Sequence, residues 1–212
     1  MNRRDLLKQI ALLTGGAVIG GELFLAGCKT GPKAEAGFTA ANISLLDEIG
    51  ETIIPATTTP GAKAAKIGEF MKVMVTDCYT EKQQATFMQG ITDLDAACEK
   101  MHGKSFMECD AAQRKELLTS LEKEAKAFNQ KRDEEDKPKR EVLMQKNSTL
   151  AWNDQKEFEP TPGNYYTMMK QLTLLGFFTS KTGMTETLRH VAVPGKYDGA
   201  VPYAKGDKAW AE

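Results

Sequence analysis

Apolar residues recur at helical spacing along most of this sequence, and this period constrains the fold more than any other feature. Capping residues and prolines mark where the helices begin and end. Methionine and alanine are common and β-branched runs are few, which favours helix over sheet. The sequence therefore predicts an all-α fold, a small helical bundle. Its helices are expected from Thr39 to Pro55, over Ala64–Tyr79, over Glu81–Met101 after the N-cap Thr80, onward from the Asp110–Gln113 capping box, and from Asn164 past Phe178.

Two segments lack this period. Residues 129–146 are dense in charges of both signs and contain Pro138, which predicts a solvated extension or a loop. After Ser180 the chain is punctuated by glycine and proline and has little regular pattern. A long tail of this kind is expected to wrap over the helical core or over a partner.

The first 28 residues have the layout of an export signal. Arg3 and Arg4 begin a cationic region, a short glycine-containing apolar run follows, and Leu25-Ala-Gly-Cys28 places small residues before a cysteine. The arginine pair resembles a twin-arginine signal, which directs folded proteins to export. The final four residues resemble a lipobox, in which Cys28 is lipidated and becomes the mature N-terminus.

Simpler alternatives remain at this point. An arginine pair also occurs in ordinary secretion signals and by chance, and the apolar run is compatible with a buried helix. A transmembrane span needs about 20 apolar residues, whereas this run is short and is followed by Glu22.

The predicted organisation is a signal peptide over residues 1–27, a polar tether over 28–37 and one helical domain over 38–212. The expected location is the periplasm, with lipid on Cys28 attaching the chain to a membrane. Lys29 after the cysteine slightly favours the outer membrane.

The cysteines leave one pairing to consider. With Cys28 assigned to lipid, three remain, and an oxidising compartment permits disulfides. A helix between Cys78 and Cys98 would hold them about 30 Å apart, far beyond disulfide range. Cys98 and Cys109 flank a predicted turn, so they are the candidate disulfide, with two free thiols as the alternative. Cys78 is expected to be a buried free thiol.

The residues themselves indicate no active site. The sequence has no glycine-rich phosphate loop, no Gly-x-Ser-x-Gly motif and no metal-ligand spacing of cysteines. The carboxylate pairs Asp47/Glu48 and Asp93/Asp95 have the spacing expected of solvated helix faces. The net charge of −1 does not favour nucleic acid. No catalytic, cofactor-binding or metal-binding residue is therefore assigned to this chain.

Several stretches resemble the gluconate 2-dehydrogenase subunit 3 family. In the N-terminal half these are Glu51–Lys66, Phe70, Asp77–Tyr79 and Phe87–Gly90, and in the C-terminal half Leu172–Ser180 and Val193–Gly199. The resemblance implies the small subunit of a membrane-associated sugar dehydrogenase. In such complexes a large subunit of the glucose-methanol-choline type carries FAD and performs the chemistry, and a cytochrome c takes the electrons. The large subunit lacks a signal and is exported together with the small one.

The resemblance thus implies a non-catalytic subunit that acts as export escort and tether for a periplasmic FAD-dependent gluconate or sugar dehydrogenase. The lipobox departs from the family pattern and suggests that this subunit provides its own anchor. A free-standing structural or binding lipoprotein is the alternative, and an enzyme in its own right is a third. The expected partner contacts, with packing against the bundle as the alternative, are Pro55, Pro60, Gly61, Phe177, Phe178, Pro194, Gly195, Tyr197 and Trp210.

Overall fold

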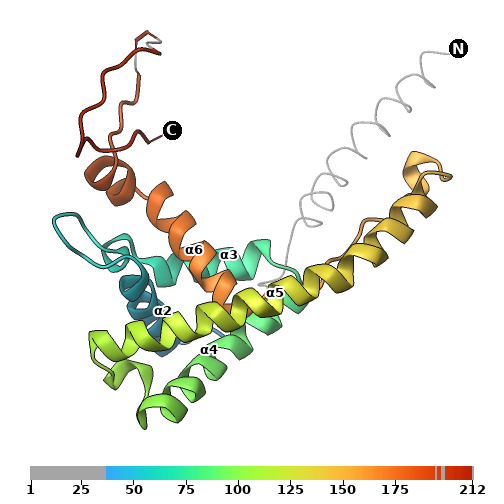
Figure 1. Cartoon of the computed structure of the whole chain (residues 1–212), viewed down its shortest axis with the longest axis horizontal. Coiled ribbons are helices and arrows are strands. Elements are labelled where there is room, and N and C mark those ends of the chain that lie inside the picture. The colour runs from blue at the N-terminus through green and yellow to red at the C-terminus, as the bar shows by residue number, and fades with distance from the viewer. Residues whose placement is uncertain (1–36, 194, 197–198, 212) are drawn as a thin grey trace, which may run out of the picture. The chain divides into compact units, whose positions relative to one another are not determined.

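The structure, a computed structural model, describes residues 37–193, 195–196 and 199–211. The predicted export signal, with Arg3, Arg4 and Cys28, and nearly all of the predicted tether lie outside this range. The described helices are α2 (Ala40–Ile53), α3 (Ile67–Cys78), α4 (Glu81–His102), α5 (Ala111–Asn147) and α6 (Tyr165–Thr179). Short helical turns are η1 (Ala62–Ala65), η2 (Phe106–Glu108), η3 (Trp152–Asp154) and η4 (Gly183–Thr187). The all-α prediction is confirmed (Figure 1).

Local capping chemistry explains where these helices begin. Thr39 accepts a hydrogen bond from the Asn42 backbone at the start of α2. Thr80 with Gln83 and Asp110 with Gln113 form reciprocal capping boxes at α4 and α5. Asn164 accepts from the Tyr166 backbone at the start of α6. The region expected as one helix over residues 64–79 is interrupted in the structure. The turn η1 ends at Ala65, and Lys66 follows in a left-handed conformation, with φ of 54°, before α3 begins.

Helix α6 is central to the core, since it packs against α2, α3, α4 and α5. Two glycines allow this close packing. A Cβ on Gly90 of α4 would overlap the Tyr165 side chain, and one on Gly176 of α6 would overlap the Phe70 ring. All buried apolar residues of the described core lie between Phe38 and Phe177. A chain that begins at Lys29 therefore retains this entire core.

The prediction of a loop over residues 129–146 is wrong, because α5 continues through this region to Asn147 with Pro138 inside it. The solvated character is confirmed, since Asp136 is the one residue of α5 beyond Ala125 that is buried in the described structure. The chain then returns alongside this half of the helix over residues 148–163 (Figure 1). The helix persists because polar contacts to the returning chain replace the missing apolar stripe.

The cysteines are arranged largely as their spacing suggests. The sulfur atoms of Cys98 and Cys109 lie 3.3 Å apart, and both residues are buried. Both are free thiols in the structure, so their disulfide stays a prediction. The expectation that Cys78 is buried is wrong: it is exposed at the end of α3, where its thiol faces the Met74 sulfur at 4.0 Å.

The tail after η4 folds back on itself. The Arg189 and Ala211 backbone amides donate to Ala209 and Arg189 respectively, at 2.8 and 2.9 Å, and Arg189 and Trp210 form a parallel bridge. Every described residue from 189 to 210 is exposed. In the described part of the chain, no helix is long and apolar enough to cross a membrane.

Candidate interaction surface

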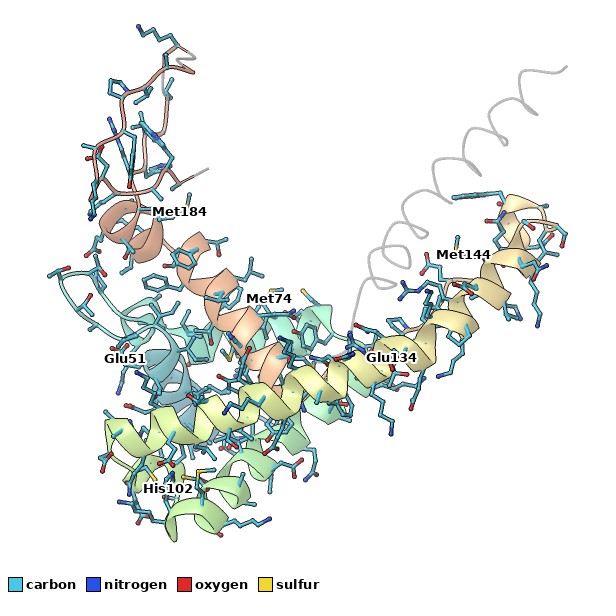
Figure 2. The ribbon with its side chains drawn as sticks, in the orientation of Figure 1. Glu51, Met74, His102, Glu134, Met144 and Met184 are labelled. Carbon is cyan, nitrogen blue, oxygen red and sulfur yellow. The ribbon has the colours of Figure 1, made fainter. Side chains whose placement is uncertain are left out.

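The loop over residues 55–61 is held in place by one carboxylate from α2. Glu51 accepts hydrogen bonds from the backbone amides of Ala56, at 2.8 Å, and of Lys63, at 2.9 Å. The Ala62 amide also donates to the Ile54 carbonyl at 2.9 Å, which closes the loop at its base. Figure 2 shows Glu51 at this base. The loop is therefore a defined protrusion rather than an unstructured connection.

The predicted contact residues of this loop have different environments. Pro55 is exposed and Pro60 is half-buried, so both present surface to a partner. Gly61 is buried, and a side chain there would not fit, since a Cβ would overlap the Glu51 carboxylate. The prediction that Gly61 contacts a partner is wrong in this structure, and its role is to let the loop close over Glu51.

The neighbouring carboxylates of α2 join other elements to this helix. Asp47 accepts from the Gly68 amide at 2.8 Å, which fixes the start of α3. Glu48 pairs with Lys63 and, at 2.7 Å, with Arg114 of α5. The hydrogen bond from Lys63, together with the nearby Arg114 charge, lowers the pKa of Glu48. The expectation that Asp47 and Glu48 lie on a solvated face is wrong, since both are half-buried links between helices.

The C-terminal half of α6 presents an exposed apolar surface. Helix α6 also packs against η1, which follows the loop. Leu174, Leu175 and Phe178 are exposed large apolar residues of this half, with Phe178 40% exposed. Phe177, in contrast, is 0% exposed and packs in the core, with its ring 5.2 Å from that of Phe178 in an edge-on arrangement. The prediction that Phe177 contacts a partner is therefore wrong, whereas Phe178 is available for contact.

The tail provides a third group of exposed residues. Trp210 is 48% exposed, and the Arg189 guanidinium stacks on its ring at 4.1 Å. Gly195 is exposed and has a φ of 75°, a conformation that favours glycine. Pro194 and Tyr197 lie outside the described residues. Val193 and Tyr203 add large exposed side chains to this part of the tail.

Burial keeps two phenols and one thiol of the core protonated at neutral pH. Burial raises the pKa of Tyr165 and of Tyr166 to about 12. Burial and the adjacent Cys109 thiol raise the pKa of Cys98 to about 12, so its reactive thiolate is scarce at neutral pH. Within the described ranges, no group of three or more His, Cys, Asp or Glu residues is placed to hold a metal ion.

The hollow along α5 has the wrong lining for a small-molecule site. Its volume is about 570 Å³, and it is lined by polar and charged side chains, including Lys126, Asp133 and Glu134. Binding pockets for small molecules are usually concave and mostly apolar. The exposed apolar residues of α6 and the tail, with the fixed loop, instead suit contact with another macromolecule.

Sequence reasoning missed two features of this surface. It did not assign Glu51 a role, although Glu51 opens the stretch on which the family resemblance rests. It also missed an exposed apolar group at the far end of α5, formed by Val142, Met144, Leu150 and Trp152. The expectation that Trp152 packs against the body of the protein is wrong, because its side chain is 84% exposed. The signal was present, because large apolar residues in a charged segment are unusual on a solvated helix.

Comparison with known proteins identifies the family. The family model described as gluconate 2-dehydrogenase subunit 3 matches residues 40–195. This range includes α2 to α6, the fixed loop and the first part of the tail. No curated protein and no solved structure matches the chain significantly. Because the family model spans most of its length, the chain belongs to the gluconate 2-dehydrogenase subunit 3 family.

Proposed function

We propose that this chain is the non-catalytic small subunit, export escort and membrane tether of a periplasmic FAD-dependent gluconate or sugar dehydrogenase. The observation that carries the proposal is the family match over residues 40–195, which implies a subunit of a gluconate 2-dehydrogenase complex. In the proposed complex, FAD and catalysis belong to a large subunit of the glucose-methanol-choline type, and a cytochrome c accepts the electrons.

The escort role follows from where a flavin is inserted. A large subunit that acquires FAD in the cytoplasm is folded before export, and the twin-arginine route transports folded proteins. Arg3 and Arg4 would then direct both subunits across the membrane, provided that they associate beforehand. The small subunit must therefore bind its partner tightly enough to remain bound during transport.

The tether role depends on Cys28. Two acyl chains hold a protein firmly at a membrane, whereas a single chain binds only marginally. A diacylated Cys28 is therefore sufficient as an anchor for the complex. Replacement of Cys28 by alanine should release the chain and its flavoprotein partner into the soluble fraction, and retention in the membrane fraction would contradict this role.

The contact surface is proposed to comprise the loop over residues 55–61, the exposed side of α6 and the tail near Trp210. Fixed apolar residues of this kind form the centres of protein interfaces. Leu175→Asp should lower the affinity for the large subunit by at least about 30-fold, because it places a charge at a buried apolar contact. The matched control is Val142→Asp, because Val142 is an exposed apolar residue far along α5. This variant should leave the affinity unchanged.

The direct test is purification of the mature chain from the cell envelope, followed by an absorption spectrum. We expect a flavin-bearing chain to co-purify in stoichiometric amount and the isolated small subunit to lack dehydrogenase activity with an artificial acceptor. Recovery of the chain without any flavoprotein would favour a free-standing lipoprotein. Dehydrogenase activity from the isolated chain would show that it is an enzyme in its own right.

A further inference from the structure

The outer half of α5 and the chain that returns along it form a projection held together by hydrogen bonds. This projection is called here the α5 arm (residues 126–163). Three polar side chains of the helix bind the returning chain. Asn129 accepts from the Asn164 amide at 3.0 Å, Asp136 from the Thr161 amide at 2.7 Å, and Asn147 from the Lys156 amide at 3.1 Å. The arm is therefore a defined element, and its outer end is held in place.

Large apolar residues are exposed at that outer end. Trp152 is 84% exposed, and Val142, Met144 and Leu150 are also exposed. Figure 2 shows Met144 near the end of α5. The four residues are called the arm tip. Holding such residues in water on an ordered element is unfavourable, which indicates a binding role for the tip.

The arrangement of the tip suits immersion better than docking into a protein groove. Val142 and Met144 are two residues apart on a helix, so they face different sides. A helix that binds in a groove presents one apolar face at i, i+3, i+4 and i+7 spacing. Side chains on several sides of an end, with a tryptophan beyond it, instead suit entry into a fluid interface. Tryptophan is the residue enriched at the boundary of lipid and water.

The charges near the tip favour an anionic surface. Residues 139–156 contain four basic side chains and two acidic ones. The basic residues are Lys139, Arg140, Lys146 and Lys156, and all four are exposed. Lys139 is paired with Asp136 at 2.9 Å, so Arg140, Lys146 and Lys156 are the charges that can face a membrane. Arg140 stacks on the Phe158 ring at 5.2 Å, which holds it beside the returning chain. Basic residues at a membrane surface each gain about fivefold in binding to anionic lipid.

The position at which the chain enters the bundle places the arm within reach of a membrane. Gly37 lies beside Met88 of α4, and Gly90, half a turn further along α4, packs on Tyr165 at the base of the arm. Cys28 precedes Gly37 by nine residues, which span at most about 30 Å. From Ala125 to Asn147 the helix extends by about 33 Å at 1.5 Å per residue. The extended tether therefore holds the base of the arm at most about 30 Å from a bilayer that contains lipidated Cys28. Because the arm is about 33 Å long, its tip can reach that bilayer.

We propose that the arm tip inserts into the interface of an anionic phospholipid membrane and forms a second contact beside the lipid on Cys28. The inference rests on the proposed lipid anchor of the previous subsection. A lipid alone lets the complex rotate about its tether, whereas two contacts fix which side of the bundle faces the bilayer. The loop at residues 55–61 and the exposed side of α6 then remain available for the large subunit.

Fluorescence of Trp152 tests the insertion directly. The chain has two tryptophans, so Trp210→Phe leaves Trp152 as its single reporter. The lipidated mature protein is reconstituted in vesicles containing phosphatidylglycerol, with acyl-chain-brominated lipid as quencher. We expect blue-shifted Trp152 emission that brominated lipid quenches. The matched Trp152→Phe protein, which reports on Trp210, should show neither effect. Unshifted emission from Trp152 that a soluble quencher still reaches would overturn the proposal.

Binding without the lipid anchor separates the tip from Cys28. A chain that begins at Lys29 should bind phosphatidylglycerol vesicles, and added salt should weaken this binding. Lys146→Gln with Lys156→Gln should reduce the binding about 25-fold, and Trp152→Ala about tenfold. Lys100→Gln with Lys123→Gln, two exposed lysines on other parts of the bundle, is the matched charge control and should have little effect. Equal losses in both lysine pairs would contradict a role for the tip.

A protein partner at the tip would give a different result. In that case Trp152 becomes protected from the soluble quencher when the large subunit binds in the absence of vesicles, which would overturn the membrane assignment. The proposed function is tested by a different experiment, the co-purification of a flavoprotein. It fails if no flavoprotein co-purifies, whatever the result at the arm tip. If the tip contacts the membrane, Trp152→Ala should leave flavoprotein recovery unchanged, whereas a loss of recovery would indicate a protein contact at the tip.

Discussion

Oxidation of Cys98 and Cys109 to a disulfide should stabilise the bundle measurably. Their sulfur atoms are 3.3 Å apart and need to approach only to the bond length of about 2.05 Å. In the reaction the two thiols lose two protons and two electrons to an added disulfide such as oxidised glutathione. The C-terminal part of α4 would then be bonded to the residue that follows η2.

The expected size follows from the loop that the bond closes. A loop of about 12 residues, from Cys98 to Cys109, corresponds to about 3 kcal/mol of stabilisation through the restricted unfolded chain. For a domain of 150–250 residues, each kcal/mol shifts Tm by about 2–4 °C. The oxidised protein should therefore melt about 6–12 °C above the reduced protein.

The assay compares thermal unfolding of the two forms of a chain that begins at Lys29. Burial raises the pKa of Cys98 to about 12, so oxidation should be carried out during refolding, while the thiol is accessible. Maleimide labelling after denaturation should detect one thiol, that of Cys78, in the oxidised form and three in the reduced form. Cys78→Ser is the control and should retain the full difference in Tm.

Two results would refute this reasoning. Three labelled thiols after oxidative refolding would show that the pair does not close. A confirmed disulfide with a Tm within about 2 °C of the reduced form would show that strain in the folded state cancels the entropic gain. Cys98→Ala with Cys109→Ala should abolish all dependence of Tm on redox conditions.

Three further changes test the packing and the polar contacts. Gly90→Ala should destabilise the protein by about 1–3 kcal/mol in urea unfolding, because the new Cβ overlaps Tyr165, whereas an unhindered helical site would gain from alanine. Glu51→Ala should cost about 1–3 kcal/mol, since two backbone amides lose their acceptor, while the exposed Glu69→Ala should change stability by less than about 0.5 kcal/mol. The hydrogen bond from Lys139, with that from the Thr161 amide, lowers the pKa of Asp136 from 3.8 to about 2. Its stabilising contribution is therefore complete above about pH 4 and lost towards pH 2, so Asp136→Asn should flatten the fall of Tm over that range.

The local features of the fold were predictable from sequence because their causes are local. Thr80 and Asp110 begin helices through contacts with residues three positions away. The continuation of α5 was not predictable in this way. Its outer half has no apolar stripe, and the contact of Asp136 with Thr161 joins residues 25 positions apart. A hydrogen bond between distant residues leaves no period in the sequence.

The contact surface was predictable only in outline for a related reason. Helix α6 is apolar on most sides, so its period does not tell which side faces the core. Phe177 and Phe178 are adjacent and identical in chemistry, yet one is fully buried and the other exposed. The role of Glu51 likewise depends on a chain reversal that brings Lys63 back to α2. The structure therefore resolves which members of each predicted group remain available to a partner.

Co-export of a flavoprotein distinguishes an export escort from a free-standing lipoprotein. Arg3→Lys with Arg4→Lys should block the signal while leaving the described domain untouched. The measurement is the distribution of this chain and of the proposed FAD-bearing large subunit between cytoplasm and periplasm, in cells that express the wild type or the variant. Both proteins should move together, periplasmic with the wild type and cytoplasmic with the variant. A large subunit that reaches the periplasm undiminished with the variant would contradict the escort role.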